Sequence, residues 1–240
     1  MAMKNYLSFG GGVNSVAMYL YLLDEKWDFE AVFVDHGTDW PETYEYVDMF
    51  KKKYPLTIIK PDNGLHGDRY NNLYDYALAA RFVPTTFFRW CTKEFKVRPI
   101  HKYYQKPCFN LLGIDFGESH RARLGSAKGI ENRYPLIEAE IDRDGCKEII
   151  RKHELPVPMR SGCYICPFQR IGQWKELRRR HPCLFQKAVE LEEANIKRSE
   201  EKGKPKRYIS NRAISLSSLV AENQIQIFKQ DEYPPCECML

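Results

Sequence analysis

The chain has 240 residues, of which 43% are hydrophobic and 29% are charged, as in an ordinary globular protein with a buried core. The net charge of +5 permits a nucleic-acid partner without requiring one. No apolar run approaches the roughly 20 residues that cross a bilayer. The first residues also lack the pattern of a signal peptide, so we expect a cytoplasmic protein. In that reducing compartment, the eight cysteines are better explained as metal ligands or reactive thiols than as disulfides.

The chain opens with a predicted strand, Met3 to Phe9, and a helix expected from Ser15 to Asp24. Between them the sequence reads SFGGGVNS. Three consecutive glycines leave no Cβ atom between backbone and ligand, so backbone amides and a helix N-terminus can face one anion together. The corner is neither a Walker loop nor the dinucleotide fingerprint, because GxxxxGK[ST] is absent and Ser15 replaces the last glycine of GxGxxG. It predicts a phosphate-binding corner, and a glycine turn without a ligand is the simpler alternative.

Strand and helix patterns then alternate through the first half of the chain. The further strands are expected at Ala31–Val34, Leu56–Lys60 and Asn110–Ile114, and the further helices at Pro41–Tyr54, Leu73–Ala80 and Lys96–Tyr104. Such alternation predicts parallel βαβ units, that is, a doubly wound, Rossmann-like α/β sheet with helices on both faces. The composition changes after about Asn132. We therefore expect an α/β domain over residues 1–132 and a smaller, basic, cysteine-containing helical part over 133–240.

A second strand–helix corner follows, with the sequence DHGTDWPET from Asp35 to Thr43. Together with the first corner it resembles the phosphoadenosine phosphosulfate (PAPS) reductase family, within the adenine nucleotide alpha-hydrolase superfamily. The segment Cys91–Ile100 is similar to the family's Cys-Cys-x-x-x-Lys-Val-x-Pro-Leu. Further along, Pro135–Ile137 and the stretch from Leu155 to Pro167 are similar to the family's order of Pro-Leu-Ile, helix, Leu-Pro and Gly-Cys-x-x-Cys. The resemblance covers about residues 4–168.

The resemblance implies an adenine nucleotide, ATP or PAPS, bound across the carboxyl ends of the first strands. The implied nucleotide-binding residues are Ser8, Phe9, Gly10, Gly11, Gly12, Asn14, Ser15, Asp35 and Gly113. Asp35 is also a catalytic candidate, and the candidates for the phosphate or sulfate are Lys96, Arg98, Arg121 and Arg123. ATP-cleaving relatives read Ser-Gly-Gly-Lys-Asp-Ser. Here Val13 and Asn14 replace the lysine and the aspartate, which removes a charge on the phosphates and a contact to the Mg²⁺ that accompanies ATP.

The Cys-x-x-Cys turn of Cys163 and Cys166 can bind zinc or two corners of an iron–sulfur cluster. In iron–sulfur members of the family, a Cys-Cys pair and a later Cys-x-x-Cys hold a [4Fe–4S] cluster. Cys91 matches the first cysteine of that pair, and Thr92 replaces the second. The fourth ligand is then Cys183 or an open iron position. A tetrahedral zinc site made of Cys91, Cys163, Cys166 and Cys183 and a set of unmetallated thiols remain alternatives. Cys108 and Cys146 are expected to be small core residues.

The last residues, Glu237-Cys238-Met239-Leu240, are partly similar to the family's C-terminal Glu-Cys-Gly-Leu-His, in which a thiolate attacks the sulfur of the bound sulfonucleotide. Cys238, with Cys236 beside it, is therefore a second catalytic candidate. Two reactions compete. One is reductive cleavage of a sulfonucleotide with a thiol reductant protein. The other is ATP-dependent adenylation followed by sulfur transfer to a nucleic acid. A metal-stapled nucleotide-binding module without turnover is the alternative to an enzyme.

The C-terminal half carries two basic runs, Arg178–His181 and Lys197–Arg207. Such runs could bind along a nucleic-acid backbone, and the nearby Tyr208 could stack on a base. The interleaved glutamates suit a solvated helix with charge pairs equally well. Apolar residues recur at helical spacing and are expected to pack this part onto the core: Trp174, Leu177, Leu184, Phe185, Ala188 and Leu191. A homo-oligomer remains open.

Overall fold

The computed structural model describes residues 3–122, 127–159, 161–210, 212 and 214–221. Arg123, Cys236 and Cys238 lie outside the described residues, so the expectations for them remain predictions. None of the described helices combines the length and the apolar character that a membrane span requires.

Five parallel strands form the central sheet in the order β3-β2-β1-β6-β7. The strands are β1 (Lys4–Phe9), β2 (Glu30–Val34), β3 (Thr57–Ile59), β6 (Cys108–Leu112) and β7 (Ile130–Arg133). The first strands run outward from β1 to β3, and the chain then crosses back to add β6 on the other side of β1. The carboxyl ends of β1 and β6 are therefore the topological switch point, where open α/β sheets bind their ligands.

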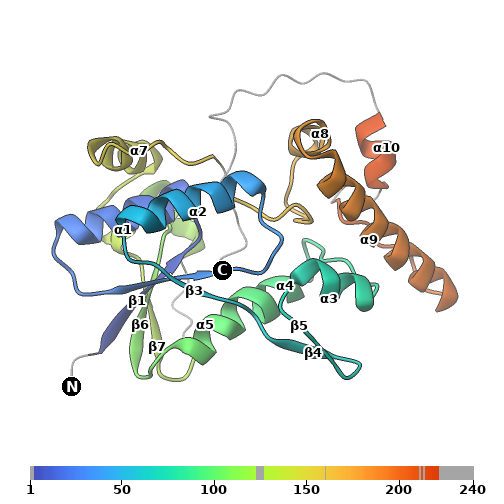
Figure 1. Ribbon diagram of the computed structural model, residues 1–240, viewed down its shortest axis with the longest axis horizontal. Helices are drawn as coiled ribbons and strands as arrows, with labels where there is room; N and C mark the ends of the chain where they lie inside the picture. Colours follow the sequence, from blue (N-terminus) through green and yellow to red (C-terminus); the bar gives the residue numbers. More distant parts are fainter. Residues whose placement is uncertain (1–2, 123–126, 160, 211, 213, 222–240) are drawn as a thin grey trace.

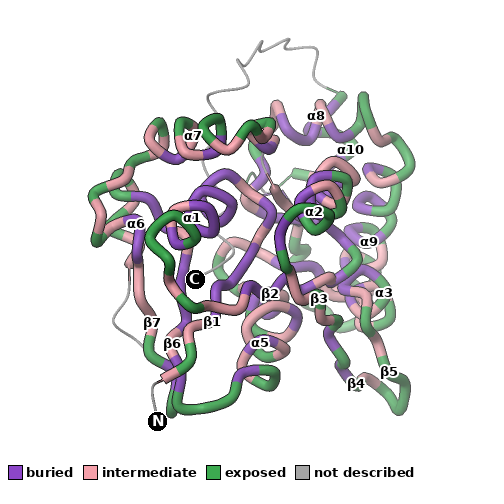
Figure 2. The backbone as a smooth tube through the Cα atoms, turned by 60° about the vertical axis from the view of Figure 1, so that its left-hand side comes forward, coloured by how far each residue is buried: buried purple, intermediate pink, exposed green. Residues whose placement is uncertain are grey.

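Helices cover both faces of this sheet (Figure 1). One face is covered by α1 (Val13–Asp24), α2 (Pro41–Lys53) and α7 (Arg143–Lys152), and the other by α5 (Arg98–Tyr103). Side chains of β1 alternate between the faces: Leu7 and Phe9 pack with α1 and α2, whereas the ring of Tyr6 stacks on Tyr104 at 4.2 Å. Figure 2 shows α1 and the inner strands as the most continuously buried segments. This arrangement confirms the predicted doubly wound fold.

The strands and helices expected in the first half are present, with bounds that shift by a few residues. The helix expected from Lys96 begins earlier, as α4 (Trp90–Thr92) and a π-helical turn over Lys93–Val97 that runs into α5. The hairpin of β4 (Asn63–Leu65) and β5 (Asp68–Tyr70) was not expected, and α3 (Leu73–Ala79) follows it. The division expected after residue 132 falls inside β7, whose sequence Ile-Glu-Asn-Arg has too little apolar pattern to predict a strand.

A second core lies in the C-terminal part, among α8 (Ile171–Arg180), α9 (Pro182–Glu201) and α10 (Leu216–Ala221). The residues expected at helical spacing are in it: Trp174, Leu177, Phe185, Ala188 and Leu191 are buried, and Leu184 is half-buried. The same core takes up Trp90, Cys163 and Cys166. The smaller elements that complete the fold are a 3₁₀ turn over Phe116–Arg121 and α6 (Pro135–Glu138). We call α8, α9 and α10 the helical lobe.

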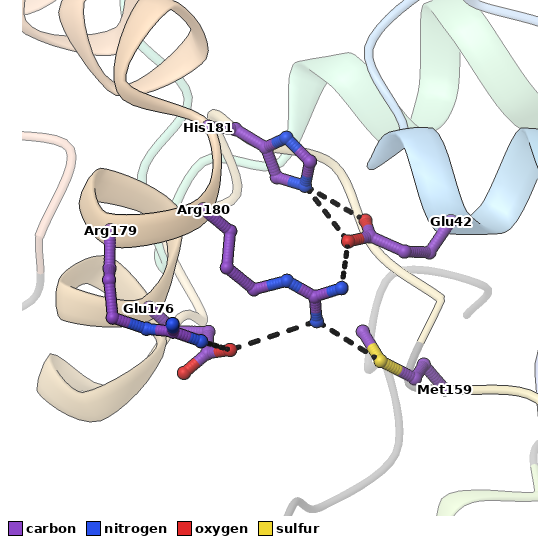
Figure 3. Close-up of polar contacts among 6 residues, drawn as sticks. All are labelled: Glu42, Met159, Glu176, Arg179, Arg180 and His181. Carbon is purple, nitrogen blue, oxygen red and sulfur yellow. Dashed lines mark hydrogen bonds and ion pairs between the residues drawn. The ribbon is translucent and has the colours of Figure 1, made fainter.

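The helical lobe is joined to the α/β part at the first turn of α2 (Figure 3). The carboxylate of Glu42 lies 2.6 Å from Nη2 of Arg180 and 2.9 Å from Nε2 of His181. Arg180 Nη1 also donates to the sulfur of Met159 at 3.3 Å and lies 3.7 Å from Glu176. The ring of His181 meets Trp40 edge-on at 5.8 Å. One carboxylate thus binds a guanidinium and an imidazole at the junction of α8 and α9.

Candidate nucleotide and thiol site

Gly10, Gly11 and Gly12, here the glycine loop, connect β1 to α1. Gly11 has a φ of +67°, and a Cβ there would lie 3.1 Å from the methyl groups of Thr43 and Val47. The Ser15 hydroxyl closes the loop, because it accepts from Gly10 N–H at 3.1 Å and donates to the Gly12 carbonyl at 3.0 Å. The first backbone amides of a helix have no carbonyl acceptor within the helix, so those of the first turn of α1 can donate to a ligand at the helix N-terminus.

Gly113, which follows β6, lies close to the first turn of α1. A Cβ on Gly113 would lie only 3.0 Å from the backbone nitrogen of Ser15. Glycine at this position therefore lets β6 approach the first turn of α1 closely. Backbone of Gly113 and of the first turn of α1 thus lie close together at the switch point of the sheet.

Two of the expected nucleotide-binding residues have their side chains inside the protein. The Ser8 hydroxyl donates to Oδ1 of Asn110 at 2.8 Å and lies 3.1 Å from the Tyr104 hydroxyl. The Phe9 ring packs on Phe50 with 4.9 Å between ring centroids. The side chains of these two residues hold β1 in place, so only their backbone groups can face a ligand at the corner.

Asn14 lies at the centre of a polar network that the sequence analysis did not identify. Its amide nitrogen donates to Oδ2 of Asp115 at 2.9 Å, and its amide oxygen accepts from Nη1 of Arg143 at 2.6 Å. Arg121 pairs with Glu118 at 2.7 Å, and Glu118 lies 3.5 Å from the same Asn14 nitrogen. Arg143 thus brings a guanidinium to Asn14, the position where ATP-cleaving relatives carry aspartate, one residue after Val13 at their lysine position. Only its place after Asp142, the N-cap of α7, could have drawn attention to it in the sequence.

At the second corner, Asp35 follows β2. Its Oδ1 accepts from the Gly37 amide at 3.0 Å, and its Oδ2 lies 3.7 Å from Nζ of Lys60. His36 is fully buried, with Nδ1 2.8 Å from the Thr38 hydroxyl. Burial lowers the pKa of His36 from 6.5 to about 4, so the imidazole is neutral at pH 7.

The Cys-x-x-Cys turn is held directly against this second corner. Asp39 and Cys163 form an antiparallel bridge, flanked by hydrogen bonds from Trp40 N–H to the Gly162 carbonyl and from Tyr164 N–H to the Thr38 carbonyl, at 3.0 and 2.8 Å. The thiol of Cys163 lies 3.1 Å from the Thr38 hydroxyl, to which it donates. The cysteine turn and the corner after β2 are therefore one unit at the carboxyl edge of the sheet.

Cys91, Cys163 and Cys166 line one cavity of about 20 Å³, the thiol cavity, together with Arg89 and Lys96. Burial raises the pKa of Cys91 to about 11 and that of Cys163 well above its usual range, so both are protonated thiols at neutral pH. Cys108 and Cys146 are buried in the core, as expected. Cys183 is exposed at the start of α9 and does not line the thiol cavity.

The three thiols of the cavity are ligands that soft metals and iron–sulfur clusters prefer. Arg89 and Lys96 would offset the negative charge of the thiolates that bind such a group. In the described part of the chain, however, no three His, Cys, Asp or Glu side chains converge as ligands of one metal ion. The expected tetrahedral zinc site is therefore not formed by these residues as they lie. The cavity has room for about one water molecule, so the cysteines must move apart before they can hold a cluster.

The cations expected at the phosphate or sulfate are distributed over the site. Lys96 lies at the thiol cavity and Arg121 beside Asn14. Arg98 is largely exposed and pairs with Glu94 on the same helical segment at 2.8 Å.

The glycine loop lies at the switch point of the parallel sheet, the place where open α/β sheets bind their ligands. Residues 4–114 match the model of the phosphoadenosine phosphosulfate reductase domain. The first half of the chain is thus similar to this domain. The predicted family resemblance is thereby confirmed. The later segments quoted for it, between residues 132 and 168, lie beyond the matched range.

Two curated relatives are uncharacterized proteins of Methanocaldococcus jannaschii. MJ0973 is 27% identical over 78% of this chain and 48% of its own length, and MJ0066 is 25% identical over 75% and 40%. The chain thus spans half or less of the relatives it matches. A solved structure, "phosphoadenylyl-sulfate (PAPS) reductase from Candida auris, phosphate complex", is similar over 66% of this chain and 76% of that chain, with 19% identity and a TM-score of 0.48.

Proposed function

We propose that this chain is an enzyme that binds an adenine nucleotide, ATP or PAPS, at the glycine loop and acts on the phosphate or phosphosulfate end in sulfur chemistry. The position of the loop supports this most strongly. It lies at the switch point of the sheet, in a domain of the PAPS reductase-like family. The thiol cavity belongs to the same edge, because Cys163 is bridged to the corner that follows β2.

The chemistry follows from the donors at this edge. Backbone amides of the loop and the start of α1 bind phosphate or sulfate oxygens without the reorganisation that flexible side chains need. The guanidinium of Arg143, held at Asn14, supplies a positive charge that Val13 does not. As negative charge develops on the leaving group, these fixed donors stabilise it.

Once moved apart, Cys91, Cys163 and Cys166 would hold a [4Fe–4S] cluster, with Cys183 or an open iron as the fourth position. Such a group supplies electron transfer or a site for an additional sulfur atom. The chain's own part is to present three thiols beside Lys96 and Arg89 at the nucleotide edge of the sheet.

ATP-dependent adenylation with sulfur transfer to a nucleic acid is the second candidate. The set of three thiols in the cavity favours it, because Thr92 replaces a fourth cysteine ligand. The basic runs favour it less, because Arg179 pairs with Glu176 and Lys206 with Glu200. ATP is then the nucleotide consumed and pyrophosphate is released. Sulfite released from PAPS in the presence of thioredoxin would instead identify reductive cleavage.

The test of nucleotide binding uses Arg143→Gln, which keeps a polar side chain and removes the guanidinium and its charge. Calorimetric titration with ATP and with PAPS should show at least one of them binding the full chain, and the variant binding it about tenfold more weakly. Arg151→Gln, on an exposed position of the same helix α7, is the matched control and should bind normally. Failure of both nucleotides to bind the unaltered chain would reject the proposal.

A further inference from the structure

A second, larger cavity lies on the other side of the Asp39 corner, between α2, α3 and α9. Its volume is about 510 Å³, within the range of pockets that bury a small organic molecule. Three aromatic rings line it, those of Tyr44, Tyr74 and Tyr164, and we call it the tyrosine pocket. Tyr164 lies inside the Cys-x-x-Cys turn, so this pocket and the thiol cavity share one segment.

The charge of the tyrosine pocket is strongly negative. Four carboxylates line it, from Asp39, Glu45, Asp48 and Asp75, against the single ammonium of Lys187. The phosphates of a nucleotide would be repelled here, whereas a cation would be attracted. The pocket is therefore chemically distinct from the glycine loop.

Asp39 distinguishes this pocket from an acidic surface, because its side chain is only 6% exposed and lines the cavity. Nε2 of His36 lies 3.4 Å from its carboxylate, but that imidazole is neutral at pH 7 and its Nε2 makes no hydrogen bond within the described residues. No lysine or arginine in the described part of the chain forms an ion pair with Asp39. A buried carboxylate without a cation is unfavourable, and a ligand cation would relieve it.

The aromatic walls suit the same kind of ligand. Nζ of Lys187 already lies 5.4 Å from the centre of the Tyr74 ring, so this wall accepts a cation over its face. Tyr74 is held in that position by a hydrogen bond from its hydroxyl to Glu190 at 2.7 Å. The hydroxyl of Tyr44 accepts from the Asp39 amide at 3.3 Å, which places a second ring beside the carboxylate.

We propose that the tyrosine pocket binds a small organic cation, an ammonium or guanidinium on an apolar body, with its charge at the Asp39 carboxylate and its body between the tyrosine rings. Because Asp39 is bridged to Cys163, such a ligand lies next to the cysteine turn, in the position of a second substrate. The inference stands on the pocket itself and does not depend on the nucleotide's binding or fate.

The experiment compares two probes of the same shape, pentylguanidine, which is cationic, and pentylurea, which is neutral. In calorimetric titrations of the full chain at pH 7 without nucleotide, pentylguanidine should bind at least tenfold more tightly than pentylurea. Asp39→Asn should weaken pentylguanidine binding at least tenfold. Asp28→Asn, which changes an exposed carboxylate away from the pocket, should leave it unchanged.

Lys187→Met gives a second reading at an exposed position, so it does not depend on how well Asp39→Asn folds. It removes the competing positive charge and keeps an apolar side chain, and should tighten pentylguanidine binding severalfold. Equal affinity for the two probes, absence of binding by either, or weaker binding in Lys187→Met would overturn the proposal. Nucleotide binding can fail in any of these proteins without affecting the result, so the two proposals are tested separately.

Discussion

At the scale of single residues, His36 shows how burial alone sets a protonation state. The imidazole lies under the corner that carries Thr38 and Asp39, and its Nε2 lacks a hydrogen-bond partner among the described residues. Burial is the main cause of its low pKa, and Asp39 only partly opposes it. The buried site accommodates the neutral imidazole, whereas a protonated imidazole would lose its hydration there at a cost in free energy.

This predicts an acid-sensitive contribution to stability. The pKa of His36 falls from 6.5 in the unfolded chain to about 4 in the folded one, so the unfolded state takes up the proton first. Between pH 7 and pH 4 the unaltered protein should lose about 3 kcal/mol of unfolding free energy that His36→Gln does not lose. Urea unfolding across this range measures it, and parallel curves for the two proteins would contradict it.

The metal content of the purified protein tests whether the cysteines of the thiol cavity are metal ligands. Protein purified without oxygen should carry iron and sulfide and a broad absorption band, which each of Cys91→Ser, Cys163→Ser and Cys166→Ser removes. Cys183→Ser decides the fourth position, because loss of iron would assign Cys183 as a ligand and retention would leave an open iron. Zinc in equal amount with the protein would favour the closed zinc site, and no metal of any kind would refute the metal centre.

At the scale of elements, Glu192 organises the end of the helical lobe. It is 1% exposed on α9, and its two carboxylate oxygens accept from the amides of Ile209 and Leu216 at 2.9 and 2.7 Å. One side chain thereby fixes both the segment after α9 and the start of α10. Burial raises the pKa of this carboxyl, and the two amides oppose that effect.

Glu192→Ala should therefore destabilise the protein by about 2–4 kcal/mol, because two buried amides lose their acceptor. Glu193→Ala, on the neighbouring exposed position, should change the stability by less than about 0.5 kcal/mol. Urea unfolding followed by circular dichroism compares the two variants. Equal effects would show that the carboxylate of Glu192 does not hold the segment.

At the scale of the whole molecule, two contacts tie the C-terminal core to the carboxyl edge of the sheet. The Cys-x-x-Cys turn is bridged to the corner after β2, and Glu42 binds Arg180 and His181 where α8 meets α9 (Figure 3). Both contacts involve the stretch from Thr38 to Glu42. The helical lobe is therefore fixed relative to the carboxyl edge of the sheet, where the proposed nucleotide lies.

Removing the carboxylate should loosen this junction. Glu42→Gln is expected to cost about 1–2 kcal/mol, because Arg180 and His181 lose a partly buried charged partner. Hydrogen exchange should rise at the end of α8 and the start of α9 while β1 stays protected. Glu45→Gln, on an exposed position of the same helix, is the control. A uniform rise over the whole chain would instead indicate general destabilisation.

Much of the α/β part could be predicted because its signals are local. A short apolar run, three glycines and an amphipathic stretch predict strand, corner and helix without knowledge of the partners. The effect of changing Gly11 could not be predicted in the same way. From the sequence, a side chain added at Gly11 would be expected to affect ligand binding alone. Its φ of +67° and the nearby methyl groups of Thr43 and Val47 mean that Gly11→Val would also disturb the packing of α2. That conflict depends on a helix more than thirty residues away.

The sequence by itself determined the parallel α/β fold, the resemblance to the PAPS reductase domain and the residue types of both corners, because these depend on periodicity and short motifs. Only the tertiary structure decided which side chains meet: Arg143 at Asn14, the three cysteines around one cavity, and Asp39 in the tyrosine pocket without an ion pair to a described lysine or arginine. The reason is physical. Contacts between residues far apart in the chain, and the burial that sets their charge, arise only when helices and strands pack, and no local pattern encodes them.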